Sequence, residues 1–246
     1  MTLLLTVGQL TLSLNSNAQK AAITSGTITF EKKVSDLALL KDAAASGPHE
    51  DISGYLQNNP EFQIYNFELS FNDHQTLYKP LTPINNKGII SRVSANNIVY
   101  SDLSAHTLVS ERSVMNIDYL VKDTLSKCVW KITKETKEIA GYECYRANGL
   151  ILDSVYVVAF YAPAIASSGG PELFHGLPGM ILQVTLPHDH ITWTAQAINS
   201  QPIESNTIVP PTKGKPTTLT NLIADLSNMV KQMAGYGVVL VKNASY

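Results

Sequence analysis

In the segment IYNFELSF (64–71), large apolar and polar side chains alternate strictly from Tyr65 to Phe71. Tyr, Phe, Leu and Phe fall at the odd positions from 65 to 71, and Asn, Glu and Ser fall between them. Successive side chains of an extended strand point to opposite faces, so this spacing predicts a strand with one buried face. Such half-buried strands are typical of antiparallel sheets, which constrains the fold more than any other feature of the chain.

Further segments share this character, because they are short, rich in β-branched and aromatic residues, and separated by Asn, Asp, Gly and Pro. In chain order they are SGTITFEKKV (25–34), GIISRVSA (88–95), NIVYSDL (97–103), TLVSERSV (107–114), DYLVKD (118–123), CVWKIT (128–133), GYECYRAN (141–148), SVYVVAFYA (154–162), MILQVTL (180–186) and ITWTAQAI (191–198). Strands and helices do not alternate along the chain. The sequence therefore predicts a mainly β fold, with an antiparallel sheet that forms an open or half barrel or a sandwich.

Two segments show helical spacing instead. SDLALLKDAAAS (35–46) begins with Ser35 as a potential cap and is followed by Gly-Pro, which predicts a short N-terminal helical insertion. In TTLTNLIADLSNMVKQMAGYG (217–237) the apolar residues recur every three or four positions, which predicts one amphipathic helix that stops at Gly235. We expect its apolar face to pack on the sheet as core. A partner or a lipid is the alternative occupant of its Met and Leu stripe.

The first residues predict a secretion signal over 1–18, followed by a single β-rich domain over 19–246. An apolar run ends at Leu14, and Ser16 and Ala18 occupy the positions of a signal-peptidase site. The exported form is then expected to begin one or two residues after Ala18.

Two alternatives to the secretion signal remain open, because no Lys or Arg precedes the apolar run. Met1 is then an internal start codon, or the run is a first strand. The run is too short to span a bilayer comfortably, and no other apolar segment is long enough to do so. The sequence thus predicts a protein of the periplasm, the medium or the outer-membrane surface, and not a transmembrane protein.

Charge gives no indication of a polyanionic partner. The chain carries 18 basic and 20 acidic residues, for a formal net charge of −2, and its Lys and Arg residues do not cluster. This composition argues against nucleic-acid binding and against recruitment to an anionic membrane surface.

Cys128 and Cys144 are the only cysteines, and export would place them in an oxidising compartment. If KETKE (134–138) is a five-residue loop between two strands, Cys128 lies directly opposite Cys144, within the range that a disulfide accepts. A four-residue loop would set Cys128 against Tyr145 instead. The sequence thus predicts a disulfide, with two free thiols as the alternative.

The stretch GGPELFHGLPGMILQV (169–184) combines Gly and Pro with the most apolar of the predicted strands. Pro178 followed by Gly179 has the order that a type II turn requires, because Pro presets φ at its second position and Gly supplies a positive φ at its third. This stretch is expected to be a structured loop that turns sharply into the strand. Close approach of a ligand is the second explanation for its glycines.

This stretch resembles the GLPGLI family of secreted Bacteroidetes proteins. The resemblance rests on Gly170, Pro171, Phe174, Gly176, Leu177, Pro178, Gly179, Ile181 and Leu182, with an upstream part at Trp130–Ile132 and Ile139–Ala147. It differs at Met180, where the family motif has Leu, and at Phe160–Pro163. The resemblance implies an exported β-rich protein, often encoded near TonB-dependent outer-membrane receptors. The family is uncharacterised, so no catalytic residues carry over to this chain.

Known catalytic patterns are missing from the sequence: there is no HExxH, GxSxG, Walker A, GxGxxG or CxxC pair. The one group with metal-ligand character is His188 and His190, with His175 thirteen residues earlier. Residues two apart on an extended segment face the same side, so the two imidazoles could share one ion. The alternative is a solvated hairpin tip. No cofactor is predicted.

Aromatic residues at 155–161, together with Trp130 and Trp193, could line a concavity for an apolar ligand, or could equally form a filled core. The sequence thus predicts an exported, non-enzymatic binding or accessory protein, serving a TonB-dependent receptor system or holding a hydrophobic or peptide ligand. A metal-binding protein that uses His175, His188 and His190 is the second hypothesis, and a hydrolase with an unrecognised site is the third.

Overall fold

The computed structural model describes residues 22–45, 60–83, 94–151, 155–204, 206–231 and 234–246. The predicted signal segment, the Gly-Pro stop after the first helix and nearly all of the strand predicted at 88–95 lie outside these residues. Within them, no helix reaches the length and apolar character needed to cross a membrane.

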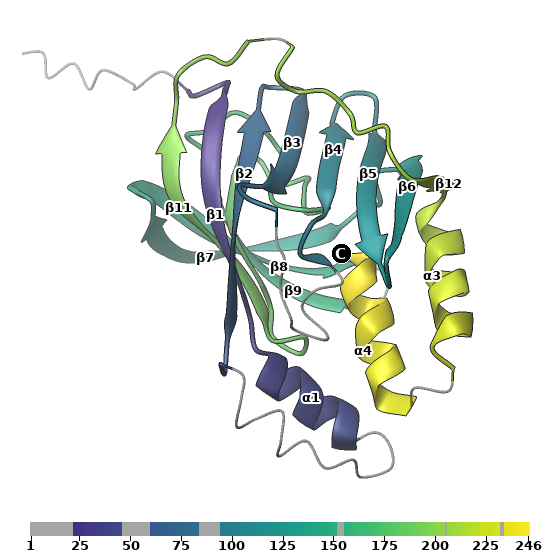
Figure 1. The fold of residues 1–246 in the computed structure, drawn as a ribbon. Coiled ribbons are helices and arrows are strands. Elements are labelled where there is room, and N and C mark those ends of the chain that lie inside the picture. The colour runs from purple at the N-terminus through teal and green to yellow at the C-terminus, as the bar shows by residue number, and fades with distance from the viewer. Residues whose placement is uncertain (1–21, 46–59, 84–93, 152–154, 205, 232–233) are drawn as a thin grey trace, which may run out of the picture.

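A single sheet of twelve strands dominates the molecule, which confirms the predicted mainly β, antiparallel fold, although the strands at 75–80 and 215–217 were not predicted (Figure 1). Its strands lie side by side in the order β12-β6-β5-β4-β3-β2-β1-β11-β10-β9-β8-β7. Neighbouring strands are antiparallel except for the short β12, which runs parallel to β6. The strands are β1 (Gly26–Val34), β2 (Gln63–Phe71), β3 (Gln75–Pro80), β4 (Ile98–Asp102), β5 (Thr107–Val114), β6 (Ile117–Thr124), β7 (Val129–Ile139), β8 (Tyr142–Ile151), β9 (Val155–Ala162), β10 (Met180–Leu186), β11 (Ile191–Asn199) and β12 (Lys215–Thr217).

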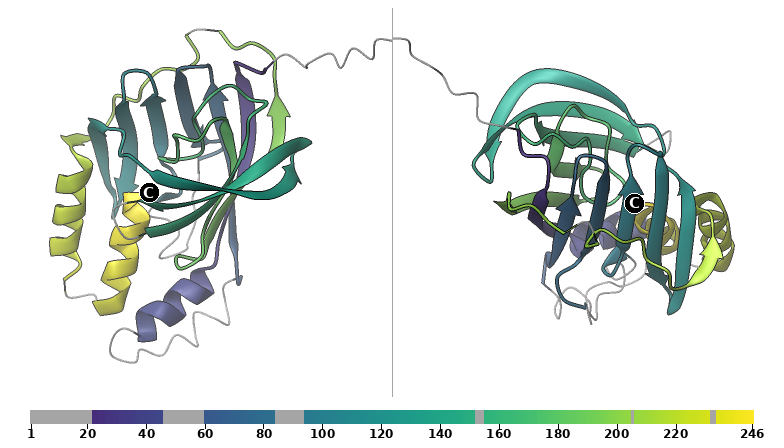
Figure 2. Two further views of the ribbon diagram at one scale, coloured as in Figure 1. Left: turned by 180° about the vertical axis from the view of Figure 1, so that it is seen from behind. Right: turned by 90° about the horizontal axis from the view of Figure 1, so that it is seen from above.

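The sheet bends strongly but does not close into a barrel, because β12 and β7 form its two edges (Figures 1 and 2). β1 lies in the middle and joins two halves, since it pairs with β2 on one side and with β11 on the other. The inner face carries the main core, as the alternation in β2 illustrates: Tyr65, Phe67 and Leu69 are buried, while Ile64 and Asn66 are exposed. The period-two pattern of the sequence therefore identifies the buried face correctly.

The first predicted helix is confirmed as α1 (Asp36–Ala45), and Ser35 caps it by accepting a hydrogen bond from the Ala38 amide at 3.2 Å. The predicted C-terminal helix is present but shorter, as α3 (Leu219–Met229), with Thr218 as its cap. A second helix follows, α4 (Ala234–Ser245), which lies between α1 and α3 and contacts both. Gly235 therefore lies inside a helix, and the prediction that a single helix stops there is wrong.

The two C-terminal helices cover one end of the sheet. Their apolar side chains form a second core with residues of β5 and β6: Val114, Tyr119 and Val121 from the strands, with Leu219, Leu222, Leu226, Val230, Leu240 and Ala244 from the helices. The expectation that the amphipathic helix packs on the sheet as core is thus confirmed. The C-terminal end of α4 and the loop before β10 both reach into the interior of the curved sheet.

The hairpin of β7 and β8 differs from the one expected. β7 continues through KETKE to Ile139, which pairs directly with Tyr142 across a two-residue turn. Ala140 and Gly141 both have positive φ, 49° and 82°, as a type I′ turn requires. This register places Cys144 opposite Lys137, not opposite Cys128, and the structure has both cysteines as free thiols. The predicted disulfide is therefore wrong, because the charged segment taken for a loop is an edge strand.

Candidate functional site

The loop 168–179, which leads from β9 into β10, lies in the interior of the curved sheet. Phe174 and Leu177 are buried in the main core, and the Phe174 ring meets Trp193 edge to face at a centroid distance of 5.4 Å. The Trp130 indole nitrogen donates a hydrogen bond of 2.9 Å to the His175 carbonyl and so ties the loop to β7. The loop is therefore an internal plug of the curved sheet, which agrees with the structural explanation of its glycines and prolines.

The turn before β10 is tighter than the predicted type II turn. The Gly179 amide donates to the Leu177 carbonyl at 2.8 Å, which makes a three-residue turn centred on Pro178. Gly179 does have a positive φ, of 147°, as expected. A Cβ atom at this position would lie 2.4 Å from the Ala162 carbonyl oxygen, so the glycine allows two backbone segments to approach closely. This close approach of two backbone segments explains why position 179 is a glycine, and a ligand is not needed to explain it.

Glu172 is the residue of the loop that sequence reasoning missed. Its φ is 50°, an uncommon conformation for a residue with a side chain, and its carboxylate is fully buried. One oxygen lies 3.3 Å from the Lys32 amine, and the other accepts a hydrogen bond of 3.2 Å from the Asn97 amide group. The loop thus delivers a negative charge into the interior of the sheet.

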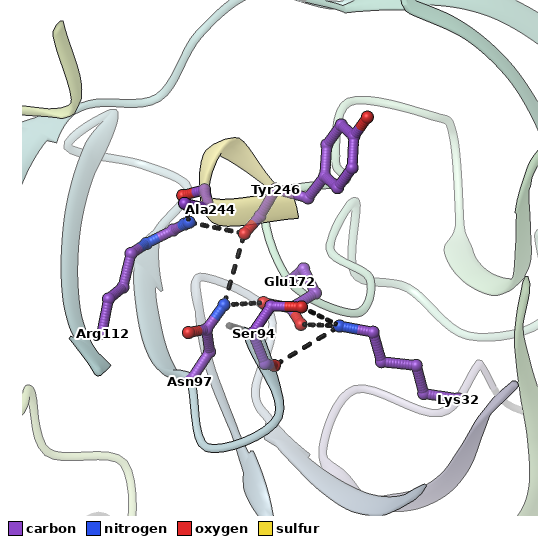
Figure 3. A network of polar contacts seen from close by, with 7 residues as sticks. All are labelled: Lys32, Ser94, Asn97, Arg112, Glu172, Ala244 and Tyr246. Carbon is purple, nitrogen blue, oxygen red and sulfur yellow. Dashed lines mark hydrogen bonds and ion pairs between the residues drawn. The ribbon is translucent and has the colours of Figure 1, made fainter. Parts of the chain in front are cut away.

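Five buried residues form an interior polar network: Lys32 on β1, Ser94 and Asn97 before β4, Arg112 on β5, and Glu172 (Figure 3). The Lys32 amine also donates to the Ser94 hydroxyl at 2.8 Å and lies 4.9 Å from the centre of the Trp193 ring. Burial lowers the pKa of the Lys32 amine, and the Glu172 carboxylate offsets part of this change. The pair therefore satisfies two charges that neither partner could keep alone in the interior.

Arg112 connects this network to the end of α4. Its guanidinium donates to the main-chain oxygens of Ala244 and Tyr246, both at 2.6 Å, and its Nε donates to the Ser110 hydroxyl at 3.0 Å. The Asn97 amide also donates to the Tyr246 oxygen, at 3.3 Å. The last turn of α4 is thus held by side chains from the sheet.

The alternation of buried and exposed positions along β1 and β5 could have identified both buried cations from the sequence. In GTITFEKKV, Lys32 follows Ile28 and Phe30 on the buried face, and in TLVSERSV, Arg112 follows Leu108 on the buried face. A cation on the core face of an amphipathic strand requires a buried partner. The partner on the loop could not be identified, because nothing in the sequence sets the direction of the Glu172 side chain.

Tyr78 lies next to this network and stacks on Phe67 at a centroid distance of 4.6 Å. Burial and the nearby Glu172 carboxylate raise the pKa of its hydroxyl well above the usual value. A hydrogen bond with the Trp193 side chain opposes part of this rise, and among the described residues Nη2 of Arg112 has no hydrogen-bond partner. Such buried polar atoms are the ones that ordered water commonly satisfies.

Apart from Tyr156, the aromatic residues of the predicted concavity belong to the filled core or pack against it. Trp193, Phe160 and Tyr161 are buried in it, and Trp130 packs against it. A cavity of about 30 Å³ remains between the loop, β5 and the C-terminal helices, with Leu108, Cys128, Phe174 and Leu219 among its walls. That volume holds about one water molecule. Of the two explanations for these aromatics, a filled core is the one that the structure supports.

The three histidines of the predicted metal site have separate roles. His175 belongs to the plug, where its Nδ1 lies 2.9 Å from the Leu173 carbonyl, and burial lowers its pKa. His190 Nε2 lies 2.9 Å from the Asp42 carboxylate of α1, and His188 is exposed at the hairpin tip. Within the described ranges, no group of three or more His, Cys, Asp or Glu side chains could hold a metal ion.

The tip between β10 and β11 contacts two helices. The alternative to a metal site was a solvated hairpin tip, and only part of this tip is solvated. Asp189 is buried and accepts from the Lys242 amine of α4 at 3.2 Å, while His190 pairs with α1. His190 also borders an open surface groove of about 430 Å³ with Lys33 and Phe62. Residues 187–190 therefore contact both α1 and α4.

The two cysteines lie in apolar surroundings. Burial raises the pKa of Cys128 to about 12 and that of Cys144 to about 11. Denatured, unreduced protein is expected to show two free thiols per chain in a colorimetric titration. In the native protein at pH 8 both thiols should react far more slowly than a free cysteine, since only the thiolate is nucleophilic. A titration that finds no thiol would restore the disulfide and contradict the hairpin register.

A family of known proteins matches the part of the chain that contains the plug. Residues 149–183, which run from the end of β8 through the plug into β10, match a family described as "Protein of unknown function (Porph_ging)". This part of the chain resembles an uncharacterised Bacteroidetes family. The Porph_ging match includes Glu172 and every glycine of the plug, but it spans a minor part of the chain. No curated protein matches the chain.

Solved structures of PNGF-II in two crystal forms share the fold. Each superposes with a TM-score of 0.51, at 16% and 13% sequence identity, over 81% and 80% of this chain. This chain spans only 32% of the length of PNGF-II in either case. At this identity the similarity shows a common β-rich architecture and nothing about individual residues.

Proposed function

We propose that this protein is an exported, non-enzymatic accessory module of the cell envelope that acts through protein contacts at its outer surface. Export follows from the predicted signal segment and from the resemblance of the plug to the GLPGLI family. That resemblance implies a location in the periplasm, the medium or at the outer membrane, near a TonB-dependent receptor system. The Porph_ging match of the same segment is compatible with this family assignment.

A filled interior is the reason to place the function on the surface. The plug occupies the concave side of the sheet with Phe174 and Leu177, and Glu172 is used for the ion pair with Lys32. Within the residues that the structure describes, the cavity beside the plug measures about 30 Å³, far less than the pockets of about 300 Å³ or more that hold small ligands. An interior carrier of apolar ligands, part of the original expectation, therefore has little support.

The observation that carries the proposal is an apolar row across three strands, exposed on the first two strands and half-buried on the third. Val129 on β7 pairs with Leu150 on β8, which pairs with Tyr156 on β9, so the three side chains are neighbours on one face of the sheet. Val129 is 80% exposed and Leu150 is 51% exposed. Contiguous exposed apolar side chains are typical of protein-interaction surfaces. We call these three residues the outer apolar row.

Site-specific photo-cross-linking in cells tests this function. A photoreactive amino acid at Val129 or Leu150 is expected to give one adduct of the same mass with an envelope protein. Val238 on α4 is the matched control, because it is an apolar residue that is 60% exposed on another element. Equal adducts from Val238, or none from either row position, would contradict the proposal.

A further inference from the structure

β7 forms a free edge of the sheet. It pairs with β8 on one side, and no strand lies beyond it in the described part of the chain. Nearly all of its residues from Lys131 to Glu138 are exposed. Alternate residues of an antiparallel strand direct their main-chain groups to opposite sides, so part of the β7 backbone is available for pairing with another strand.

The charges at the end of this edge are self-complementary. Residues 134–138 read Lys, Glu, Thr, Lys, Glu, so reversing the direction exchanges every positive charge with a negative one. An antiparallel copy centred on Thr136 would set Lys134 against Glu138 and Glu135 against Lys137. A parallel copy in register would instead set like charges against each other, which is unfavourable.

Of these four charged residues, only Glu135 forms an ion pair among the residues that the structure describes. Glu135 forms an ion pair of 2.7 Å with Arg146, and the Lys137 amine lies 4.0 Å from the centre of the Phe160 ring. Among the described residues, Lys134 and Glu138 take part in no ion pair. The outermost pair of the self-complementary segment is therefore free to form between two copies.

We propose that the β7 edge binds the β7 edge of a second copy of this chain, antiparallel and centred on Thr136, in a two-fold symmetric dimer. Such a contact is isologous, because each copy contributes the same residues. The register of β7 against β8 shifts between Ile132 and Thr136, but β7 stays extended through this bulge, so the contact with the second copy is confined to residues 134–138. The contact is thus short and reversible. Val129 lies about 23 Å along the strand from Thr136, so the outer apolar row stays accessible in the dimer.

Sedimentation equilibrium over a concentration series tests the dimer with a charge swap. Wild-type protein is expected to dimerise reversibly, and more weakly as salt is raised. Lys134→Glu or Glu138→Lys each creates two like-charge contacts across the two-fold axis and should weaken the dimer roughly tenfold or more. The double variant restores opposite charges at both contacts and should return the dissociation constant to near that of wild type.

Lys122→Glu is the matched control, because Lys122 is exposed on β6 and its replacement makes the same change in net charge. This variant should dimerise as wild type does. A monomer at all concentrations, a double variant as weak as the single variants, or an equal loss in Lys122→Glu would each overturn the proposal. Far-ultraviolet circular dichroism of each variant establishes that its fold is intact. Loss of the dimer would leave cross-linking at Val129 unaffected, so the two proposals fail independently.

Discussion

Replacing Glu172 with alanine is expected to lower the free energy of unfolding by about 3 to 5 kcal/mol, because it leaves the buried Lys32 amine without its counter-charge. For a domain of this size that corresponds to a melting temperature lower by roughly 10 °C. Differential scanning calorimetry and urea titration measure the effect. A loss under about 1 kcal/mol would show that water reaches Lys32 in the native state.

A double variant and a surface pair serve as controls for this prediction. Lys32→Met with Glu172→Gln removes both charges while it retains an acceptor for the Asn97 amide, and it should recover at least half of the loss. Lys79 and Glu68 form a comparable ion pair at 3.6 Å, but their side chains are 42% and 30% exposed. Glu68→Ala should cost at most about 1 kcal/mol. Equal effects at Glu68 and Glu172 would contradict the role of burial.

Replacing Gly179 with alanine is expected to destabilise the protein by about 3 kcal/mol or more, and valine by more than alanine. The added Cβ would lie 2.4 Å from the Ala162 oxygen and 2.8 Å from the Pro163 Cα, both backbone atoms that can move only with β9. The φ of 147° adds strain for any residue with a side chain. Thermal unfolding of the purified variants checks both substitutions.

Gly141→Ala separates the two causes. Gly141 also has a positive φ, of 82°, but a Cβ atom there would meet nothing within 4 Å. This variant therefore carries only the conformational cost, about 1 kcal/mol. If Gly179→Ala costs no more than Gly141→Ala, the close approach of Gly179 to β9 does not exist in solution.

Period-two patterns made most of the sheet predictable. The predicted bounds of β5 and β10 agree with the structure, and β2 buries the face that its alternation indicates. Alternation reports which side of a strand meets the core, and this is a local property. It carries no information about pairing order, so the central place of β1 between β2 and β11 could not be derived from it.

The errors occur where tertiary contacts override local preference. KETKE looks like a loop because it is charged, yet an edge strand that is exposed on both faces needs no apolar residues. AGYGVVLVKNAS contains two glycines and several valines, which disfavour a helix, but contacts with α1, α3 and Arg112 hold it as α4. The candidate site was located only in part: the plug was recognised from its glycines, whereas its ion pair depends on the fold.

The position of β1 also determines how such a chain can acquire its structure. The partner of Thr27 across the sheet is Asn199, so β1 and β11 close a loop that contains most of the chain. Pairing over such long separations makes folding slow, because the entropy of closing the loop must be lost before contacts compensate for it. While the chain is synthesised or translocated, one edge of β1 stays unpaired until residues 191–199 arrive. An unpaired β1 edge is a site at which such a chain is prone to aggregate, so we expect the interval before β11 arrives to be the vulnerable stage of its folding.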